Sequence, residues 1–221
     1  MFYVVATPIG NLEDISLRAL NILKSVDLIL AEDTRRIKKL LTKYEIKTKV
    51  ISYNDYSSKI KEEKIINFLK EEKSIALVSD SGTPLISDPG YSLVNKVIEN
   101  GIKISPIPGA CAAISALSVS GCSVDKFSFI GFFPKKNSLK NKIIDLILNT
   151  NMTIIFYESP YRIIKTLELL NNYIPKRKIC VAREISKMFE EIIYGETKNV
   201  VEKFKKIKIK GEFTVVVDSK K

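Results

Sequence analysis

The first half of the chain alternates short apolar runs with amphipathic segments, and this rhythm constrains the fold more than any other feature. The apolar runs predict strands at residues 2–6, 26–31, 50–52, 75–78 and 103–107. The segments between them predict helices at 15–24, 34–43, 57–72 and 91–100. Strands that alternate with helices form a mainly parallel sheet covered on both faces, so we expect an α/β domain here.

The second half contains the same kinds of element in a less regular order. Strands are predicted at residues 127–131, 153–157, 179–182, 191–194 and 213–217, and helices at 139–148, 161–170 and 197–205. Because strands follow one another without a helix more often here, we expect a mixed sheet. The small residues of 120–123 mark the boundary expected between a domain of residues 1–119 and one of residues 120–221, with a cleft between them.

The residue types present exclude several kinds of site. The chain has no His, which rules out His-based triads, His metal sites and His proton shuttles, so a general base must be Asp, Glu, Lys or Tyr. The three cysteines, Cys111, Cys122 and Cys180, are odd in number and widely spaced. This pattern argues against a disulfide framework and a zinc knuckle, and we expect no metal.

Hydropathy favours a cytoplasmic protein without a membrane partner. No apolar run approaches the ~20 residues that span a bilayer. The first residues lack the charged segment and long apolar core of a signal peptide, and are typical of a buried strand.

The formal net charge of +11 suggests an anionic partner. Basic residues cluster at 34–39, 135–142 and 203–210. Nucleic acid is one interpretation of these clusters. The other is that Lys is so plentiful in this chain that many surfaces are basic without any function.

Polar or Gly/Pro-rich loops follow four of the first five predicted strands, at residues 7–11, 32–35, 79–90 and 106–111. In a parallel sheet such loops share one edge, which is where ligands bind. Residues 79–90 hold two turn signals, Gly-Thr-Pro and Asp-Pro-Gly, where a simple connection needs one. The alternatives are ordinary turn chemistry and, for Asp33 or Thr34, helix capping.

An absent pattern narrows the ligand class. No Gly-x-Gly occurs in the chain, so it has neither the dinucleotide fingerprint nor a Walker A loop. A shaped edge without phosphate-cradling glycines favours a ligand without phosphates, and S-adenosylmethionine is one such ligand.

Several segments together resemble a known family across nearly the whole chain. In order, they are 7–12 (TPIGNL), 31–35 (AEDTR), 77–91 (LVSDSGTPLISDPGY), 108–110 (PGA), 131–134 (GFFP), 156–159 (FYES) and 182–184 (ARE). They resemble the ribosomal small subunit methyltransferase I family, the 16S rRNA (cytidine-2′-O)-methyltransferases of the tetrapyrrole methylase superfamily. Members carry an additional C-terminal helical segment, from which this sequence departs.

The resemblance implies a two-domain fold, usually a homodimer, with S-adenosylmethionine bound in the cleft between domains and the small ribosomal subunit as substrate. By motif position, it also implies which residues bind the cofactor: Pro8, Ser81, Gly82, Thr83, Ile86, Cys111, Ala112, Tyr157, Lys187 and Met188.

Methyl transfer to a ribose hydroxyl needs a base, and three carboxylates at the inferred ligand edge are candidates: Asp33, Asp80 and Glu158. Each has a structural alternative, as a helix cap, a loop organiser and a partner of Arg183, respectively. Asp88, before Pro-Gly, is expected to be structural.

Cationic and polar residues near the same edge are candidate RNA contacts. Arg35 is expected to hold the phosphate next to the target nucleotide by a bidentate contact. The other candidates are Arg36, Tyr53, Asn54, Asp55, Lys135 and Lys136.

Two rival functions stay open on the sequence. One is a tetrapyrrole C-methyltransferase, whose substrate carries many carboxylates and also suits a basic protein. The other is a non-enzymatic RNA-binding protein of the same fold, which would bind no cofactor.

Overall fold

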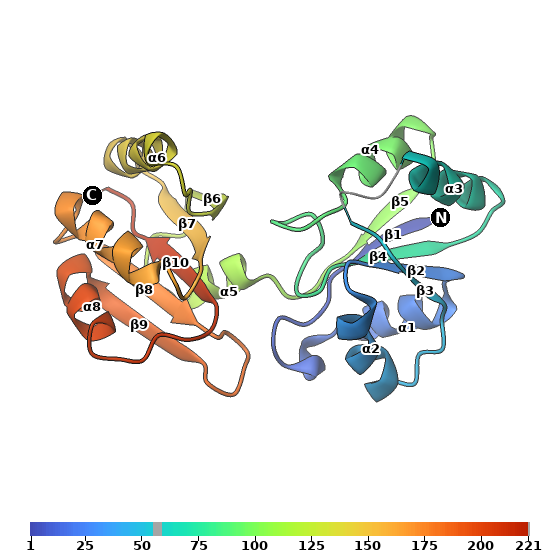
Figure 1. Ribbon diagram of the computed structural model, residues 1–221, viewed down its shortest axis with the longest axis horizontal. Helices are drawn as coiled ribbons and strands as arrows, with labels where there is room; N and C mark the ends of the chain where they lie inside the picture. The colour runs from blue at the N-terminus through green and yellow to red at the C-terminus, as the bar shows by residue number, and fades with distance from the viewer. Residues whose placement is uncertain (55–58, 221) are drawn as a thin grey trace. The chain divides into compact units, whose positions relative to one another are not determined.

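The computed structural model describes residues 1–54 and 59–220 and divides the chain into two compact units, Met1–Cys111 and Ala112–Lys221. Each unit has one five-stranded sheet with helices packed against it (Figure 1). Among the helices in the described ranges, none has the length and apolar character needed to span a lipid bilayer.

The first unit has a wholly parallel sheet of strand order β3-β2-β4-β1-β5, as the alternating pattern predicts. Its strands are β1 (Phe2–Val5), β2 (Leu28–Ala31), β3 (Val50–Ser52), β4 (Ile75–Val78) and β5 (Ile104–Ile107). Its helices are η1 (Leu12–Asp14, a 3-10 turn), α1 (Leu17–Ser25), α2 (Thr34–Lys43), α3 (Lys59–Lys70) and α4 (Tyr91–Glu99). Residues 57 and 58 of the expected helix 57–72 lie outside the described residues.

Two helices cover each face of this sheet (Figure 1). On one face, α1 and α2 bury Leu23, Ile37 and Leu40 against the strands. On the other face, α3 and α4 bury side chains such as Ile65 and Leu93. Burying one such side chain stabilises the fold by about 1.5–3 kcal/mol, so the apolar stripe of each helix decides which side it presents to the sheet.

The register brings four strand ends to one level. Val5 at the end of β1 pairs with Val78 at the end of β4 and with Ile107 at the end of β5. Ala31 at the end of β2 also pairs with Val78. The loops that leave these strands therefore start side by side along the carboxyl edge of the sheet.

The second unit has the expected mixed sheet, of order β6-β7-β10-β8-β9, in which only β6 and β7 pair in parallel. Its strands are β6 (Phe127–Phe132), β7 (Thr153–Glu158), β8 (Lys178–Arg183), β9 (Glu191–Glu196) and β10 (Phe213–Val217). Its helices are α5 (Ala112–Val119), α6 (Asn137–Asn149), α7 (Ile163–Tyr173) and α8 (Thr197–Phe204).

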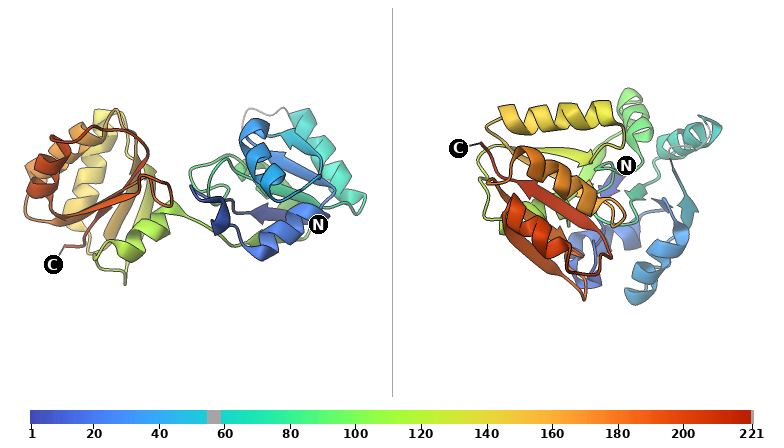
Figure 2. Two further views of the ribbon diagram at one scale, coloured as in Figure 1. Left: turned by 90° about the horizontal axis from the view of Figure 1, so that it is seen from below. Right: turned by 60° about the vertical axis from the view of Figure 1, so that its left-hand side comes forward.

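The sequence pattern did not predict α5, because its small and apolar residues fall on all sides and give no helical periodicity. This helix packs on β7, β8 and β10, on the face opposite α7 and α8 (Figure 2). The division between units therefore falls before Ala112, ahead of the boundary expected at 119/120.

Candidate active site

Backbone hydrogen bonds join the loops that follow β1 and β4. The N–H of Thr7 donates to the carbonyl of Gly82 at 2.8 Å, and the N–H of Gly82 donates to the carbonyl of Thr7 at 3.1 Å. The buried hydroxyl of Thr7 also donates to the carbonyl of Ser79 at 3.2 Å. These bonds hold the two loops as one piece at the carboxyl edge.

The loop after β5 contacts the two joined loops. The hydroxyl of Thr83 donates to the carbonyl of Ala110 at 3.1 Å. Gly82 has a φ of +87°, and a Cβ there would lie 3.3 Å from Cγ2 of Ile9. A Cβ at Gly109 would lie 2.8 Å from the Cβ of Ala6. The left-handed backbone favours glycine at position 82, and the close approach of Ala6 favours it at position 109.

The structure thus brings together the cofactor residues expected in the first unit. Ser81 and Ile86 are exposed on the joined loops, whereas Pro8, Thr83 and Cys111 are half-buried. Leu85 and Ser87 both have left-handed backbones, with φ of 72° and 66°. Non-glycine residues rarely adopt this conformation, so the surrounding structure must hold this loop in its shape.

A network of two carboxylates and two guanidinium groups lies between this piece and the start of α2. Oδ1 of Asp80 accepts the N–H of Asp33 at 2.9 Å, and its Oδ2 pairs with Arg36 at 3.3 Å. Asp33 caps α2 by accepting the N–H of Arg35 at 2.9 Å. The Arg35 side chain binds both oxygens of Asp33, at 3.0 and 2.8 Å.

This network bears on the expected role of Asp33 as a base. The hydrogen bonds that Arg35 donates lower the pKa of Asp33 to about 2. A carboxylate of such low pKa accepts a proton poorly near neutral pH. The structural alternatives, a helix cap for Asp33 and a loop organiser for Asp80, both describe the contacts that these side chains make.

Asp88, which was expected to be structural, has a raised pKa, in contrast to Asp33. Burial, and then the negative charges of Glu32 and Asp80, raise its pKa to about 6. A raised carboxyl pKa in a ligand-binding edge is a common mark of a functional group. The sequence signal, an Asp before Pro-Gly, indicates only a turn, so this residue could be found only from the packing around it.

In the second unit, Tyr157 lies at the start of α5. Its hydroxyl accepts the N–H of Ala113 at 3.3 Å. Its ring packs edge-on against Phe129 and Phe132, with centroid distances of 4.8 and 5.6 Å. Ala112, another expected cofactor residue, is the first residue of α5, so these two expected residues are neighbours.

Glu158 is a buried structural anchor. Its carboxylate accepts from Arg162 at 2.6 Å, from the hydroxyl of Thr166 at 2.7 Å and from the N–H of Ser159 at 2.7 Å. With its side chain fully buried, it has no face left for a substrate. Its partner is Arg162 rather than the expected Arg183, because the chain turns into α7 directly after β7 and brings position i+4 back over the carboxylate.

Lys187 and Met188 differ in their availability. The ammonium group of Lys187 pairs with Glu184 at 2.9 Å and with Glu212 at 2.8 Å. The Met188 side chain is exposed, with 91% of its surface accessible. The cofactor contacts expected of both residues stay predictions.

The expected RNA contacts also divide by exposure. Tyr53 is 1% exposed and its hydroxyl donates to Glu62 at 2.8 Å. The prediction that it contacts RNA is therefore wrong, because its apolar ring belongs to the core under α3. Asn54 is exposed and Asp55 lies outside the described residues. Lys135 and Lys136 are exposed at the start of α6.

Comparison with known proteins identifies the family. The family of Tetrapyrrole (Corrin/Porphyrin) Methylases matches residues 1–201. The "Ribosomal RNA small subunit methyltransferase I" of Thermotoga maritima is 44% identical, over 98% of this chain and 97% of the relative. The proteins of the same name from Hydrogenobaculum sp. and Bacillus subtilis are 47% and 44% identical, over 97% and 99% of this chain and 94% and 75% of theirs.

Solved structures agree on the fold. The methyltransferase CobJ superposes with a TM-score of 0.72 at 17% identity, over 99% of this chain and 93% of its own. A diphthine synthase gives a TM-score of 0.70 at 12% identity, over 98% and 89%. At such identities the likeness concerns the fold alone. The near full-length relatives go further and confirm the resemblance found in the sequence: the chain belongs to the tetrapyrrole methylase family and, within it, to the ribosomal RNA small subunit methyltransferase I group.

Proposed function

We propose that this protein methylates the 2′-hydroxyl of a cytidine ribose in 16S rRNA of the small ribosomal subunit, with S-adenosylmethionine as the methyl donor. The observation that carries the proposal is the 44–47% identity to ribosomal RNA small subunit methyltransferase I proteins over nearly the whole chain. Under this proposal the enzyme works in the cytoplasm, where ribosomes are assembled.

The residues at the carboxyl edge suit this cofactor. The joined loops offer main-chain polar groups, the hydroxyl of Ser81 and the exposed side chain of Ile86, a mixture that matches a nucleoside with an amino acid arm. The carboxylates of Glu32, Asp80 and Asp88 make this edge locally negative within a basic protein. A negative setting favours a ligand that carries sulfonium and ammonium charges.

When bound, S-adenosylmethionine supplies a methyl group that its positive sulfur already activates. The protein's own contribution is chiefly alignment, because in-line displacement needs the oxygen, carbon and sulfur in one geometry. The Thr7–Gly82 bridge and the Thr83–Ala110 hydrogen bond support this role, since they keep three loops in fixed relation.

A neutral hydroxyl is a weak nucleophile, so a group must accept its proton as the bond forms. Asp33, Asp80 and Glu158, our candidates from the sequence, are all engaged in ion pairs. We therefore propose Asp88 as the base, because a pKa of about 6 keeps it ionised at neutral pH while leaving it basic enough to take the proton.

Arg35 and Arg36 serve in this proposal as the phosphate contacts beside the target. Their side chains are 88% and 67% exposed, and their aspartate partners hold them at the edge. An RNA phosphate would meet two oriented guanidinium groups there, which suits bidentate recognition. Lys135, Lys136 and Asn54 are further proposed contacts.

We also propose that the enzyme is a homodimer, as is usual in the family. Large apolar side chains that are half or more exposed support it, among them Ile114, Val124 and Phe189. Light scattering on a sizing column tests this; a monomer across a range of protein concentrations would contradict it.

The decisive experiment is methyl transfer from labelled S-adenosylmethionine to small ribosomal subunits from cells that lack this enzyme. Labelled 2′-O-methylcytidine in the 16S rRNA is the expected product, and its absence would overturn the proposal.

Calorimetry with the cofactor excludes the non-enzymatic RNA-binding rival if binding is seen. Label on a porphyrinoid and none on RNA would instead favour a tetrapyrrole methylase; among the comparisons, structures bearing that kind of title resemble this chain at only 14–17% identity.

A further inference from the structure

The segment from Thr34 to Lys49 is rich in positive charge. Seven of its 16 residues are Lys or Arg and one is Glu, in a chain whose net charge is +11. Most of these residues lie on α2, whose apolar side chains Ile37, Leu40 and Leu41 are buried against the sheet. The charge is therefore confined to the outer face of one helix and to the irregular segment that follows it.

The spacing arranges these cations in a stripe. Arg35, Lys38 and Lys39 are three and four residues apart, so they lie on the same side of the helix. The stripe starts at the carboxyl edge, where Arg35 belongs to the proposed site, and follows a helix that is about 15 Å long. It therefore extends the proposed site down one face of the first unit.

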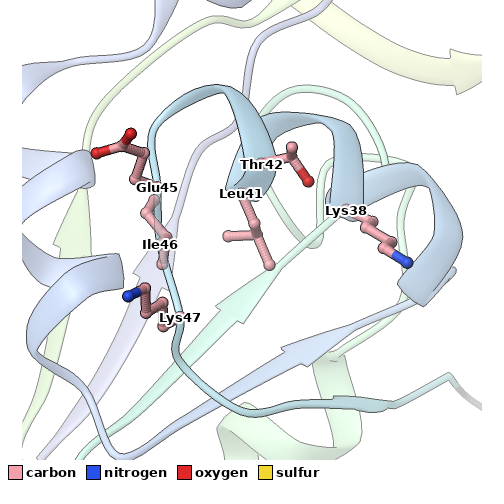
Figure 3. Close-up of a pocket in the computed structure, with 6 residues that line it drawn as sticks. All are labelled: Lys38, Leu41, Thr42, Glu45, Ile46 and Lys47. Atoms are coloured by element: carbon pink, nitrogen blue, oxygen red, sulfur yellow. The ribbon is translucent and has the colours of Figure 1, made fainter.

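A shallow pocket lies beside the second half of the stripe. Its volume is about 620 Å³, and its lining residues are Lys38, Leu41, Thr42, Glu45, Ile46 and Lys47. Figure 3 shows Lys38 and Lys47 at opposite ends of this pocket, with Leu41 between them. Lys47 adds a cation from the segment after α2, so positive charge lies on two sides of the hollow.

The two lysines of the stripe and Lys47 are available for a partner. Lys38, Lys39 and Lys47 are exposed, and none of them has a carboxylate within ion-pair distance among residues 1–54 and 59–220. Around α8 the lysines are mixed: Lys198 pairs with Glu196 and Lys205 with Glu202 and Glu168, whereas Lys203 has no ion pair within the described ranges. What distinguishes Lys38, Lys39 and Lys47 is therefore their position: they continue from Arg35 at the carboxyl edge, and Lys38 and Lys47 line the pocket beside α2.

From this arrangement we infer that Lys38, Lys39 and Lys47, which we call the α2 basic face, bind the sugar-phosphate backbone of the substrate RNA outside the target nucleotide. The inference rests on the proposed function and deepens it, because it assigns a second RNA contact that the cofactor does not share. Ammonium groups without partners gain most from phosphates, which also release condensed counterions when they are neutralised. Contacts of this kind fix the position of the strand and do not read its sequence.

The test compares two triple variants that change the charge equally. K38E/K39E/K47E reverses the α2 basic face, and K203E/K206E/K208E reverses three exposed lysines of the second unit as the matched control. Binding is measured with small subunits that lack the modification and with naked 16S rRNA, at several salt concentrations. K38Q/K39Q/K47Q and thermal unfolding curves separate a loss of binding from a loss of folding.

If the inference holds, K38E/K39E/K47E weakens binding to both RNAs by roughly 10- to 100-fold and makes the salt dependence shallower by about 2 in log–log slope, as for three lost single-strand phosphate contacts. Its affinity for S-adenosylmethionine stays at the wild-type value, and the control changes far less. Equal losses in both variants, or no loss in either, would overturn it. So would a loss with subunits alone, because the partner would then be a ribosomal protein.

These outcomes are distinct from failure of the proposed function. A wild-type protein that binds 16S rRNA through the α2 basic face but transfers no methyl group would overturn the activity and keep the surface. If the wild type methylates the subunit and K38E/K39E/K47E does so with equal efficiency, the proposed activity stands and the α2 basic face is overturned.

Discussion

The main-chain N–H of Asp33 donates to Oδ1 of Asp80 at 2.9 Å, which ties the start of α2 to the loop after β4. Arg36 completes the connection through Oδ2 of Asp80. Asp80 thus links two loops that are 47 residues apart in the chain. It positions the arginines that we propose to hold the RNA.

Replacing Asp80 should therefore affect stability and RNA use together. Asp80→Ala leaves the partly buried N–H of Asp33 without its acceptor, which costs up to about 1–3 kcal/mol. Asp80→Asn keeps an oxygen acceptor but loses the charge that faces Arg36. We expect urea unfolding to rank the proteins wild type, Asn, Ala in decreasing stability, with the KM for subunits rising in both variants. An Asn variant as unstable as the Ala variant would contradict this positioning role.

Replacing Arg35 should separate effects on RNA use from effects on cofactor binding. Its side chain is almost fully exposed and contacts Asp33, so its removal should leave the fold intact. We expect Arg35→Ala to lower kcat/KM for small subunits by roughly 10-fold or more, as for a lost charge-assisted phosphate contact. The Kd for S-adenosylmethionine, measured by calorimetry, should not change. Arg35→Lys keeps the charge but not the bidentate geometry, so its kcat/KM should lie between those of the wild type and Arg35→Ala. An equal loss of cofactor affinity would remove Arg35 from the RNA side of the site.

The carboxyl edge could be predicted from the sequence because its cause is local. Apolar runs such as Ile75–Val78 mark buried strands, and in a parallel sheet the loops that follow them must share an edge. The joined strand ends at Val5, Ala31, Val78 and Ile107 follow directly from that rule.

What could not be predicted depends on packing between distant segments. The pKa of Asp88 depends on burial and on Glu32, which is 56 positions earlier, and no local pattern encodes either. The burial of Tyr53 depends on Glu62 of α3, which gives its hydroxyl a partner in the core. The Glu158–Arg162 pair had a usable signal in its i+4 spacing, which the more distant Arg183 obscured.

Gly82 tests whether the joined loops bind the cofactor. Gly82→Ala places a methyl group 3.3 Å from Cγ2 of Ile9 at a φ of +87°, so either Ile9 or the Thr7–Gly82 bridge must give by a few tenths of an ångström. Gly101→Ala is the matched control, since its φ is +66° and nothing lies within 4 Å of the new methyl group. Both variants should lose about 1–2 kcal/mol of stability from the left-handed backbone. We expect only Gly82→Ala to raise the Kd for S-adenosylmethionine severalfold; an unchanged Kd would place the cofactor elsewhere.

The charged carboxylate of Asp88 should lower the stability of the fold while it supports methyl transfer. Its pKa of about 6 in the folded state lies above the ordinary 3.8, so the folded protein binds more protons than the unfolded chain between these values. Stability therefore falls as the pH rises from about 4 to about 6, and the full penalty is present above that range.

Asp88→Asn removes this penalty. We expect the variant to be more stable than the wild type at pH 8, by at most about 2 kcal/mol because the group is partly exposed to solvent, and equally stable near pH 3.5. Urea unfolding across this pH range measures the difference.

The same variant should lose methyl transfer at pH 8 while it still binds S-adenosylmethionine. The wild-type kcat should rise with pH through about 6, as Asp88 ionises. Glu32→Gln is the control, because removing its charge should lower the pKa of Asp88 and shift that activity profile to lower pH. A variant that gains stability and keeps full activity would show that the strain at Asp88 serves something other than proton transfer.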